Sequence, residues 1–228
     1  MLERVLVPIH RAGWPFIAAF LAAALLLGLL SGTLFWLGLI ATAWCVYFFR
    51  DPPRYTPVRP GLLVSPADGV IEMIAQAAPP PELEMGAEEL TRVSIFLNVF
   101  DVHINRIPIG GRVARIAYRP GKFFNAALDK ASEENERNAL RIDLDTGESV
   151  AVVQIAGLVA RRILCHIHEG ETLRSGERFG LIRFGSRTDL YLPKGVEPQV
   201  ALGQRVLGGE SVIADMMSKE PQRFAEVR

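Results

Sequence analysis

The stretch 180–193 reads Gly180-Leu181-Ile182-Arg183-Phe184-Gly185-Ser186-Arg187-Thr188-Asp189-Leu190-Tyr191-Leu192-Pro193. A Gly-Ser pair separates two apolar runs that have the composition of β-strands. Because Gly-Ser is a common turn dipeptide, the simplest interpretation is a β-turn or bulge at Gly185-Ser186. A second interpretation is that the chain cuts its own Gly185–Ser186 peptide bond and uses Ser186 as a catalytic group. The local pattern leaves both interpretations open.

Composition excludes some classes of function. The 228 residues carry 25 basic and 25 acidic side chains, so nothing indicates bulk binding of nucleic acid. The two cysteines, Cys45 and Cys165, lack the spacing of zinc ligands, and we interpret both as reduced packing residues. His166 and His168 would share one face of a strand over Val159–His168, but no third ligand accompanies them. We therefore expect no metal site.

Much of the hydrophobic content lies in residues 1–50, and no charged side chain occurs between Trp14 and Phe49. The pattern predicts two short helices, Trp14–Leu30 and Thr33–Phe49, that turn at Ser31-Gly32. Basic residues flank the run on both sides, and a hairpin places both flanks on the cytoplasmic side of a membrane. We expect a membrane-anchoring helical hairpin in the inner membrane. The alternative is a buried core hairpin, but no comparably long apolar segment follows to cover it.

The rest of the chain predicts a mainly β domain. Residues 51–60 are rich in proline and arginine and are typical of a linker. From residue 61 to residue 228, short β-rich runs alternate with glycine turns, and no nucleotide-binding glycine loop occurs. This pattern favours a compact β-barrel or sandwich-like catalytic domain behind the hairpin.

Taken singly, the candidate chemical groups in this domain are weak signals. Asp68 precedes a glycine in a turn, where aspartate usually caps the backbone. His103 ends an apolar run, where histidine is more often a hydrogen-bonded core residue. Ser186 lacks the G-x-S-x-G elbow of serine hydrolases. Lys130, in Asp129-Lys130-Ala131, is similar to the lysine of lipoyl domains, which leaves a non-catalytic lipoyl- or biotinyl-like module as an alternative.

The order of the motifs is more specific than any one of them. The chain contains Pro66-Ala67-Asp68-Gly69, then Asp101-Val102-His103-Ile104-Asn105-Arg106-Ile107-Pro108, then Pro120-Gly121-Lys122-Phe123 with Asn135-Glu136-Arg137-Asn138, then Phe184-Gly185-Ser186. In this order the motifs resemble the phosphatidylserine decarboxylase family, in particular its short bacterial form. The resemblance covers essentially the whole chain.

The resemblance implies a self-processing lyase. Ser186 attacks the Gly185 carbonyl, residues 1–185 become the β chain, and residues 186–228 become the α chain with a pyruvoyl group made from Ser186. The pyruvoyl ketone forms a Schiff base with phosphatidylserine and accepts the electrons released by decarboxylation to phosphatidylethanolamine. No separate cofactor-binding site and no metal is implied. A pyruvoyl enzyme acting on a soluble amino acid is the remaining alternative, and the apolar N-terminus argues against it.

The resemblance assigns Asp68 and a histidine to activation of Ser186, and His103 mainly to decarboxylation. Longer relatives carry a second histidine for processing three residues after the first, where this chain has Arg106. Either His103 serves both steps, or the processing group is built differently. The expected partners are membrane lipid and the α and β chains of one precursor, and a homo-oligomer is left open.

Overall fold

The computed structural model describes residues 7–121, 135–157, 162–183 and 186–226. The chain divides into two compact units, one formed by Met1–Pro53 with Phe100–Val102, the other by Arg54–Val99 with His103–Arg228. Gly185 and Lys130, which the sequence singled out, lie outside the described residues.

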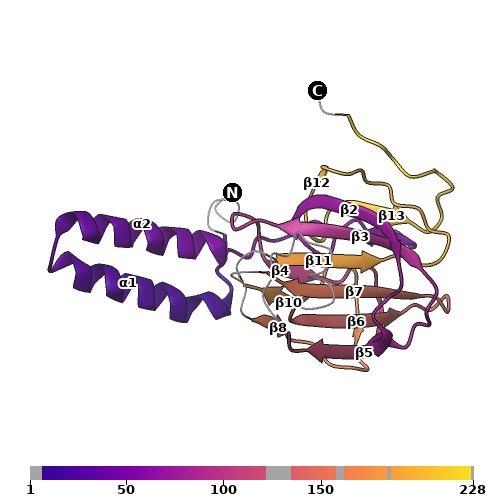
Figure 1. The fold of residues 1–228 in the computed structure, drawn as a ribbon, viewed down its shortest axis with the longest axis horizontal. Coiled ribbons are helices and arrows are strands. Elements are labelled where there is room, and N and C mark those ends of the chain that lie inside the picture. The colour runs from indigo at the N-terminus through magenta and orange to yellow at the C-terminus, as the bar shows by residue number, and fades with distance from the viewer. Residues whose placement is uncertain (1–6, 122–134, 158–161, 184–185, 227–228) are drawn as a thin grey trace. The chain divides into compact units, whose positions relative to one another are not determined.

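The first unit is a helical hairpin, as predicted. A short 3-10 turn, η2 (Arg11–Gly13), leads into α1 (Trp14–Gly28), and α2 (Gly32–Phe48) returns alongside it (Figure 1). The helices approach closely at Gly38, where an added Cβ would lie 2.6 Å from the Ala24 Cβ. Small residues at such a crossing allow the backbones to come together, as in membrane helix pairs.

The outward faces of the hairpin are apolar. Leu26 and Ile40 are each 66% exposed, and Trp36 is 65% exposed. Within the described residues, one helical stretch, Arg11–Gly28, is long and apolar enough to cross a membrane, and Gly32–Phe48 is a shorter apolar helix. An exposed apolar surface of this kind on a hairpin is typical of contact with lipid or another apolar partner.

The second unit consists mainly of β-strands, which confirms the predicted fold class. The described strands are β1 (Leu62–Val64), β2 (Gly69–Ala77), β3 (Leu90–Leu97), β4 (Ile104–Arg106), β5 (Gly111–Arg119), β6 (Arg137–Asp143), β7 (Ser149–Ala156), β8 (Ile163–Cys165), β9 (Thr172–Leu173), β10 (Arg178–Ile182), β11 (Ser186–Tyr191), β12 (Arg205–Val206) and β13 (Val212–Asp215). A 3-10 turn, η3 (Pro81–Leu83), lies between β2 and β3.

The described strands form a large curled sheet and two small ones. The large sheet has the order β12-β2-β3-β11-β7-β6-β5-β9, and its named pairs are antiparallel (Figure 1). The small sheets have the orders β4-β10-β8 and β1-β13. Strand β11 therefore lies in the interior of the large sheet, between β3 and β7.

The alternation of side chains fixes which residues of β11 face the main core. Val93, Ile95 and Leu97 of β3 and Leu190 of β11 belong to the main hydrophobic cluster. Because side chains two residues apart share a face of a strand, Ser186 and Thr188 lie on the same face as Leu190. Arg187, Asp189 and Tyr191 lie on the opposite face.

Two local predictions are wrong. Ser186 is not in a turn, because it is the first residue of β11 and pairs with Leu97 on one side and Ala156 on the other. The strand predicted through His168 ends at Cys165. His168 lies beyond it, is exposed, and pairs with Glu171 at 2.8 Å across a turn at Gly170. Among the described residues, no group of three His, Cys, Asp or Glu side chains could hold a metal ion.

Candidate active site

Ser186 is buried at the beginning of a central strand. Its exposure is 0%, and within the part of the chain that the structure describes its Oγ has no hydrogen-bond partner. Buried hydroxyl groups are nearly always hydrogen-bonded, because leaving one unpaired costs about 1–3 kcal/mol. Ser94 Oγ in β3 is also buried without a partner among the described residues, so this feature leaves the Ser186 hydroxyl available for reaction but does not alone distinguish a site.

His103 lies beside the segment that leads to Ser186. It is 1% exposed and immediately precedes β4. Its carbonyl oxygen accepts a hydrogen bond of 3.1 Å from the Ile182 amide. Ile182 ends β10, four residues before Ser186.

Asp68 is held rigidly in the turn before β2. Arg54 donates to its Oδ2 at 2.6 Å, and the Gly208 amide donates to its Oδ1 at 2.8 Å. The turn is packed tightly, because a Cβ added at Gly69 would lie 2.2 Å from the Phe96 carbonyl oxygen. This turn lies level with the start of β11, but β3 separates the two, so the backbones are about 10 Å apart.

A chain of buried side-chain hydrogen bonds connects the strands around Ser186. Asn138 donates to Gln154 Oε1 at 2.9 Å, Gln154 donates to Asn105 Oδ1 at 2.8 Å, and Asn105 donates to Thr188 Oγ1 at 3.1 Å. Each of these four residues is at most 2% exposed. Asn105 lies two residues after His103, and Thr188 lies two residues after Ser186. These hydrogen bonds therefore connect the His103–Arg106 segment to β11.

The same network reaches the turn that contains Asp68. The Pro66 carbonyl oxygen accepts from the Arg106 amide at 2.9 Å and from Asn105 Nδ2 at 3.5 Å. The structure therefore joins the Pro66–Gly69 turn, the His103–Arg106 segment and the first residues of β11 through hydrogen bonds.

Asn135 and Glu136 brace the strand end opposite Ser186. Asn135 Nδ2 donates to the Ala156 carbonyl oxygen at 2.7 Å, and the Ala156 amide donates to the Glu136 carbonyl oxygen at 2.9 Å. Glu136 Oε1 accepts from the Ile163 amide at 3.2 Å. Ala156 is the residue of β7 that pairs with Ser186. Asn135 and Glu136 therefore hold the backbone of the strand that lies next to Ser186.

Arg106 occupies the position at which the longer relatives are expected to have a second histidine. Its Nη1 donates to the Gly176 carbonyl oxygen at 2.9 Å, and its exposure is 5%. Its Cδ packs against the backbone at Gly209, where an added Cβ would lie 2.8 Å away. The identity of the group that activates Ser186 stays a prediction, with His103 and Asp68 as the candidates.

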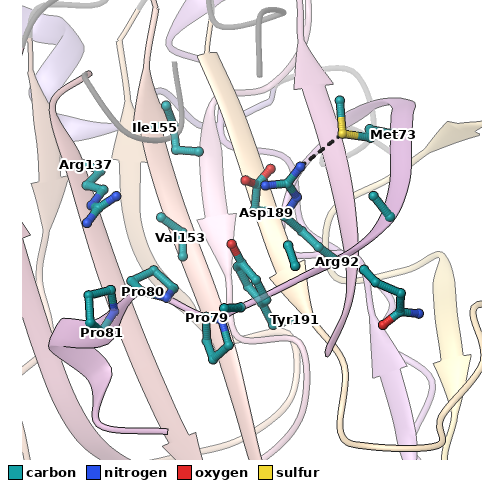
Figure 2. Close-up of a pocket in the computed structure, with 14 residues that line it drawn as sticks. Met73, Pro79, Pro80, Pro81, Arg92, Arg137, Val153, Ile155, Asp189 and Tyr191 are labelled. Atoms are coloured by element: carbon teal, nitrogen blue, oxygen red, sulfur yellow. Dashed lines mark hydrogen bonds between the residues drawn. The ribbon is translucent and has the colours of Figure 1, made fainter. Parts of the chain in front are cut away.

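The opposite face of β11 carries charges that the sequence analysis missed. Arg187 and Asp189 form an ion pair of 2.9 Å, and each side chain is 1% exposed. Beside them lies a cavity of about 670 Å³, which Figure 2 shows between the sheet and Pro79–Pro81. Arg92 lines it and donates to Met73 Sδ at 3.0 Å. Opposite charges two residues apart in a strand were the available signal for the ion pair.

Comparison with known proteins decides the family. The model of the family described as phosphatidylserine decarboxylase matches residues 41–214. The chain belongs to the phosphatidylserine decarboxylase family.

Curated members of the family match over nearly the full length. A phosphatidylserine decarboxylase proenzyme of Cereibacter sphaeroides is 59% identical over 228 residues, which is 100% of this chain and 98% of that protein. The proenzyme of that name from Paramagnetospirillum magneticum is 55% identical and covers 97% of this chain and 92% of its own length. The one from Ruegeria pomeroyi is 58% identical and covers 95% and 99%. The resemblance inferred from the motif order is thereby confirmed, and these matches favour a decarboxylase over a lipoyl- or biotinyl-like module.

Proposed function

We propose that this chain decarboxylates phosphatidylserine to phosphatidylethanolamine after cutting itself between Gly185 and Ser186. The observation that supports this most is that hydrogen bonds join the Pro66–Gly69 turn and the His103–Arg106 segment to β11, at the start of which the Ser186 Oγ is buried without a partner among the described residues. Family membership and the proenzyme names of the relatives support the same reading.

The proposed self-cleavage uses only groups of the chain and water. Ser186 Oγ bonds to the Gly185 carbonyl carbon, the peptide C–N bond breaks, and the hydroxyl proton ends on the freed amine. Removal of the Cα proton of residue 186 then breaks its Cβ–Oγ bond and leaves a carboxylate on Gly185. Water replaces the nitrogen of the resulting dehydroalanine, ammonia leaves, and residue 186 becomes a pyruvoyl group.

The first step needs a base, because a serine hydroxyl is a weak nucleophile. His103 and Asp68 are the proposed activating groups. The hydrogen bonds from Arg54 and Gly208 hold Asp68 in one orientation, and the bond from Ile182 to the His103 carbonyl fixes the backbone of His103.

The residues around position 186 suit a pyruvoyl group. The unpaired Oγ is the atom that residue 186 loses in its formation, and the paired residue Ala156 carries only a methyl group. A pyruvoyl ketone supplies an electron sink for the carbanion left when carbon dioxide departs. We assign to His103 the return of a proton to the substrate Cα, because it is buried beside the strand that leads to residue 186.

A phospholipid substrate implies association with a membrane, and the apolar hairpin suits an anchor. Arg11–Gly28 would extend about 27 Å and Gly32–Phe48 about 25 Å, slightly less than the hydrocarbon thickness of about 30 Å. We propose that the hairpin inserts in the inner membrane from the cytoplasmic side, because its termini are basic on both flanks.

An assay with two substrates tests the proposed function. Purified wild-type chain in mixed micelles should release carbon dioxide from phosphatidylserine and much less from free serine, and Ser186→Ala should release none. Equal turnover of the two substrates would favour a decarboxylase of a soluble amino acid. Turnover by Ser186→Ala would contradict the role of residue 186.

A further inference from the structure

The side chain of Phe100 belongs to the same compact unit as the hairpin, because Phe100–Val102 is grouped with Met1–Pro53. Phe100 is 58% exposed, whereas the next two residues, Asp101 and Val102, are buried. A single exposed phenyl group is common on soluble proteins, so its exposure alone indicates little. What the ring can contact depends on the part of the unit that holds its backbone.

The backbone of Phe100 is held at the base of the hairpin, which is formed by residues 8–14 and 47–51. At this base the chain that enters α1 pairs with the chain that leaves α2, through an antiparallel bridge between Ile9 and Arg50. Arg50 Nη2 also donates to the Phe100 carbonyl oxygen at 2.7 Å. Phe100 therefore lies level with the end of α2, although 50 positions separate it from Arg50 in the sequence.

This base has the composition of a membrane–water interface. Trp14, the first residue of α1, is 57% exposed, and Tyr47, in the last turn of α2, is 47% exposed. The Arg50 guanidinium lies 3.7 Å from the centre of the Tyr47 ring, and Arg11 is exposed as well. Aromatic rings and arginines suit the depth of lipid headgroups, where a ring meets acyl chains and a guanidinium reaches phosphates. Phe100 adds another exposed ring at this level.

We propose that Phe100 inserts into the membrane interface at the base of the hairpin, so that the Phe100–Val102 segment is part of the membrane-binding surface. The proposal rests on the proposed function, because it assigns the hairpin to a lipid bilayer. The partner is a phospholipid layer, because the exposed apolar surface of the hairpin continues into a base whose arginines suit anionic headgroups.

Insertion of Phe100 has a consequence for the candidate active site. Phe100 precedes His103 by three residues, so their Cα atoms are at most about 11 Å apart. The serine headgroup of phosphatidylserine lies at the depth at which the ring of Phe100 is held. The inserted ring therefore limits the distance of His103 from the headgroups, and the lipid can react while its acyl chains stay in the bilayer.

An environment-sensitive fluorophore at position 100 tests the insertion directly. Phe100→Cys in the Ser186→Ala, Cys165→Ala chain is labelled with a nitrobenzoxadiazole dye, and Cys45 is kept because it is fully buried. Leu202→Cys in the same background is the matched control, because Leu202 is 57% exposed in the second unit. The chains are reconstituted in phosphatidylcholine vesicles that contain phosphatidylglycerol.

Two quenchers report where each label lies. The label at position 100 should be quenched by nitroxide-bearing lipids and shielded from aqueous iodide, and the label at position 202 should show the reverse. Quenching at position 100 by iodide alone would overturn the proposal, because the ring would lie in water. Shielding from both quenchers would also overturn it, because protein would then cover the ring. A chain that does not enter the vesicles would overturn it as well.

Kinetics of the processed enzyme give a second readout. Phe100→Asp should raise the KM for phosphatidylserine in vesicles several-fold, with a smaller change in kcat, and Phe100→Trp should stay near the wild-type KM. A short-chain phosphatidylserine dissolved in water should be affected much less by Phe100→Asp, because it needs no bilayer. An unchanged KM in vesicles, or an equal loss of kcat on both substrates, would overturn the proposal.

Failure of the proposed function gives a different result. The vesicles of the fluorescence experiment contain no phosphatidylserine, so insertion is measured without decarboxylation. If the wild type shows no turnover of phosphatidylserine, the proposed function fails, whereas the two quenchers still report on position 100. If the wild type turns over lipid while iodide alone quenches the label at position 100, the insertion is wrong and the proposed function stands.

Discussion

Thr188 connects β11, which begins at Ser186, to β4, which begins directly after His103. Its Oγ1 accepts the last hydrogen bond in the chain from Asn138 through Gln154 and Asn105. The Gln154 donor fixes the orientation of the Asn105 amide, because Asn105 Oδ1 accepts from it. Asn105 Nδ2 must therefore face Thr188, and a change at Thr188 should alter the position of Ser186 without changing the shape of the core.

Replacement of Thr188 by valine tests that link. Valine keeps the shape and removes the acceptor, and a lost buried hydrogen bond costs about 1–3 kcal/mol. We expect Thr188→Val to cleave itself at least about tenfold more slowly than the wild type, and Thr188→Ser to cleave at a near-normal rate. The rate is measured as the loss of intact chain on denaturing gels. Ser94→Ala, which removes another buried hydroxyl of the same sheet, should cleave normally. Wild-type cleavage in Thr188→Val would show that the network has no part in processing.

Asp68 has a structural role whatever its part in catalysis. Its ion pair with Arg54 is nearly buried, with side chains 9% and 8% exposed. In the Ser186→Ala background, Asp68→Asn leaves the Arg54 charge buried, so the free energy of unfolding should fall by about 3 kcal/mol in urea titrations. Glu220→Gln breaks an exposed pair with Arg223 and should cost well under 1 kcal/mol. Equal stability of the two variants would contradict this account of Asp68.

At the scale of elements, the helical hairpin and the β-strands face different surroundings. The strands enclose a continuous core, and Leu97, Leu140 and Leu190 are fully buried. The hairpin exposes its leucines, which is unfavourable in water and favourable in lipid. The β-strands therefore suit a domain surrounded by water, and the hairpin suits apolar surroundings such as lipid.

A double substitution, Leu26→Asp with Leu37→Asp, tests the hairpin as an anchor. An aspartate costs about 2.5–3.5 kcal/mol at the middle of a membrane helix, which is an upper value for Leu26 near the end of α1. We expect flotation with phospholipid vesicles to fall sharply relative to the wild type. Leu202→Asp serves as the control, because Leu202 in the second unit is 57% exposed, as Leu37 is. Undiminished flotation of the double variant would exclude the hairpin as the anchor.

At the scale of the whole molecule, paired carboxylates set the response to acid. Burial raises the pKa of Glu82 and of Asp143, but hydrogen bonds from Arg137 to Glu82, and from Ser149 and Arg141 to Asp143, outweigh it, so both pKa values lie below the usual range. The hydrogen bond from Arg174 lowers the pKa of Glu177. Glu72 acts in the opposite direction, because burial raises its pKa.

A carboxyl group with a lowered folded pKa stabilises the protein above its unfolded pKa, and that stability is lost as the pH falls through the folded value. Four groups act this way, because the hydrogen bond from Arg59 also lowers the pKa of Asp215, and Glu72 opposes them. The melting temperature of the Ser186→Ala chain in detergent should therefore be nearly constant from about pH 7 to 5.5 and fall below about pH 4.5. A melting temperature that rises between pH 4.5 and 3 would contradict the assignment of these ion pairs.

Sequence patterns predicted the parts of the fold that depend on periodicity. The uncharged run from Trp14 to Phe49 predicted both helices, because a break at Ser31-Gly32 interrupts an otherwise continuous apolar segment. The glycine-punctuated runs predicted a mainly β domain. The motif order predicted the family, but it gave no geometry for Asp68, His103 or Ser186.

Other features depend on contacts between distant strands, which no local pattern encodes. Gly-Ser was expected to turn, yet Ser186 pairs with Leu97 and Ala156 because β3 and β7 flank it. The links from Asn105 to Thr188 and from Asn135 to Ala156 span 83 and 21 residues. Ile163 and Ile182 become neighbours only through the β8–β10 register.

The intact mass of the purified protein tests the central claim most directly. The account predicts that the wild type separates under denaturing conditions into residues 1–185 and residues 186–228, the smaller fragment beginning with a ketone and resisting N-terminal sequencing. Ser186→Ala should remain one chain of 25.1 kDa. A wild-type protein that remains a single chain of that mass, yet decarboxylates phosphatidylserine, would contradict the account.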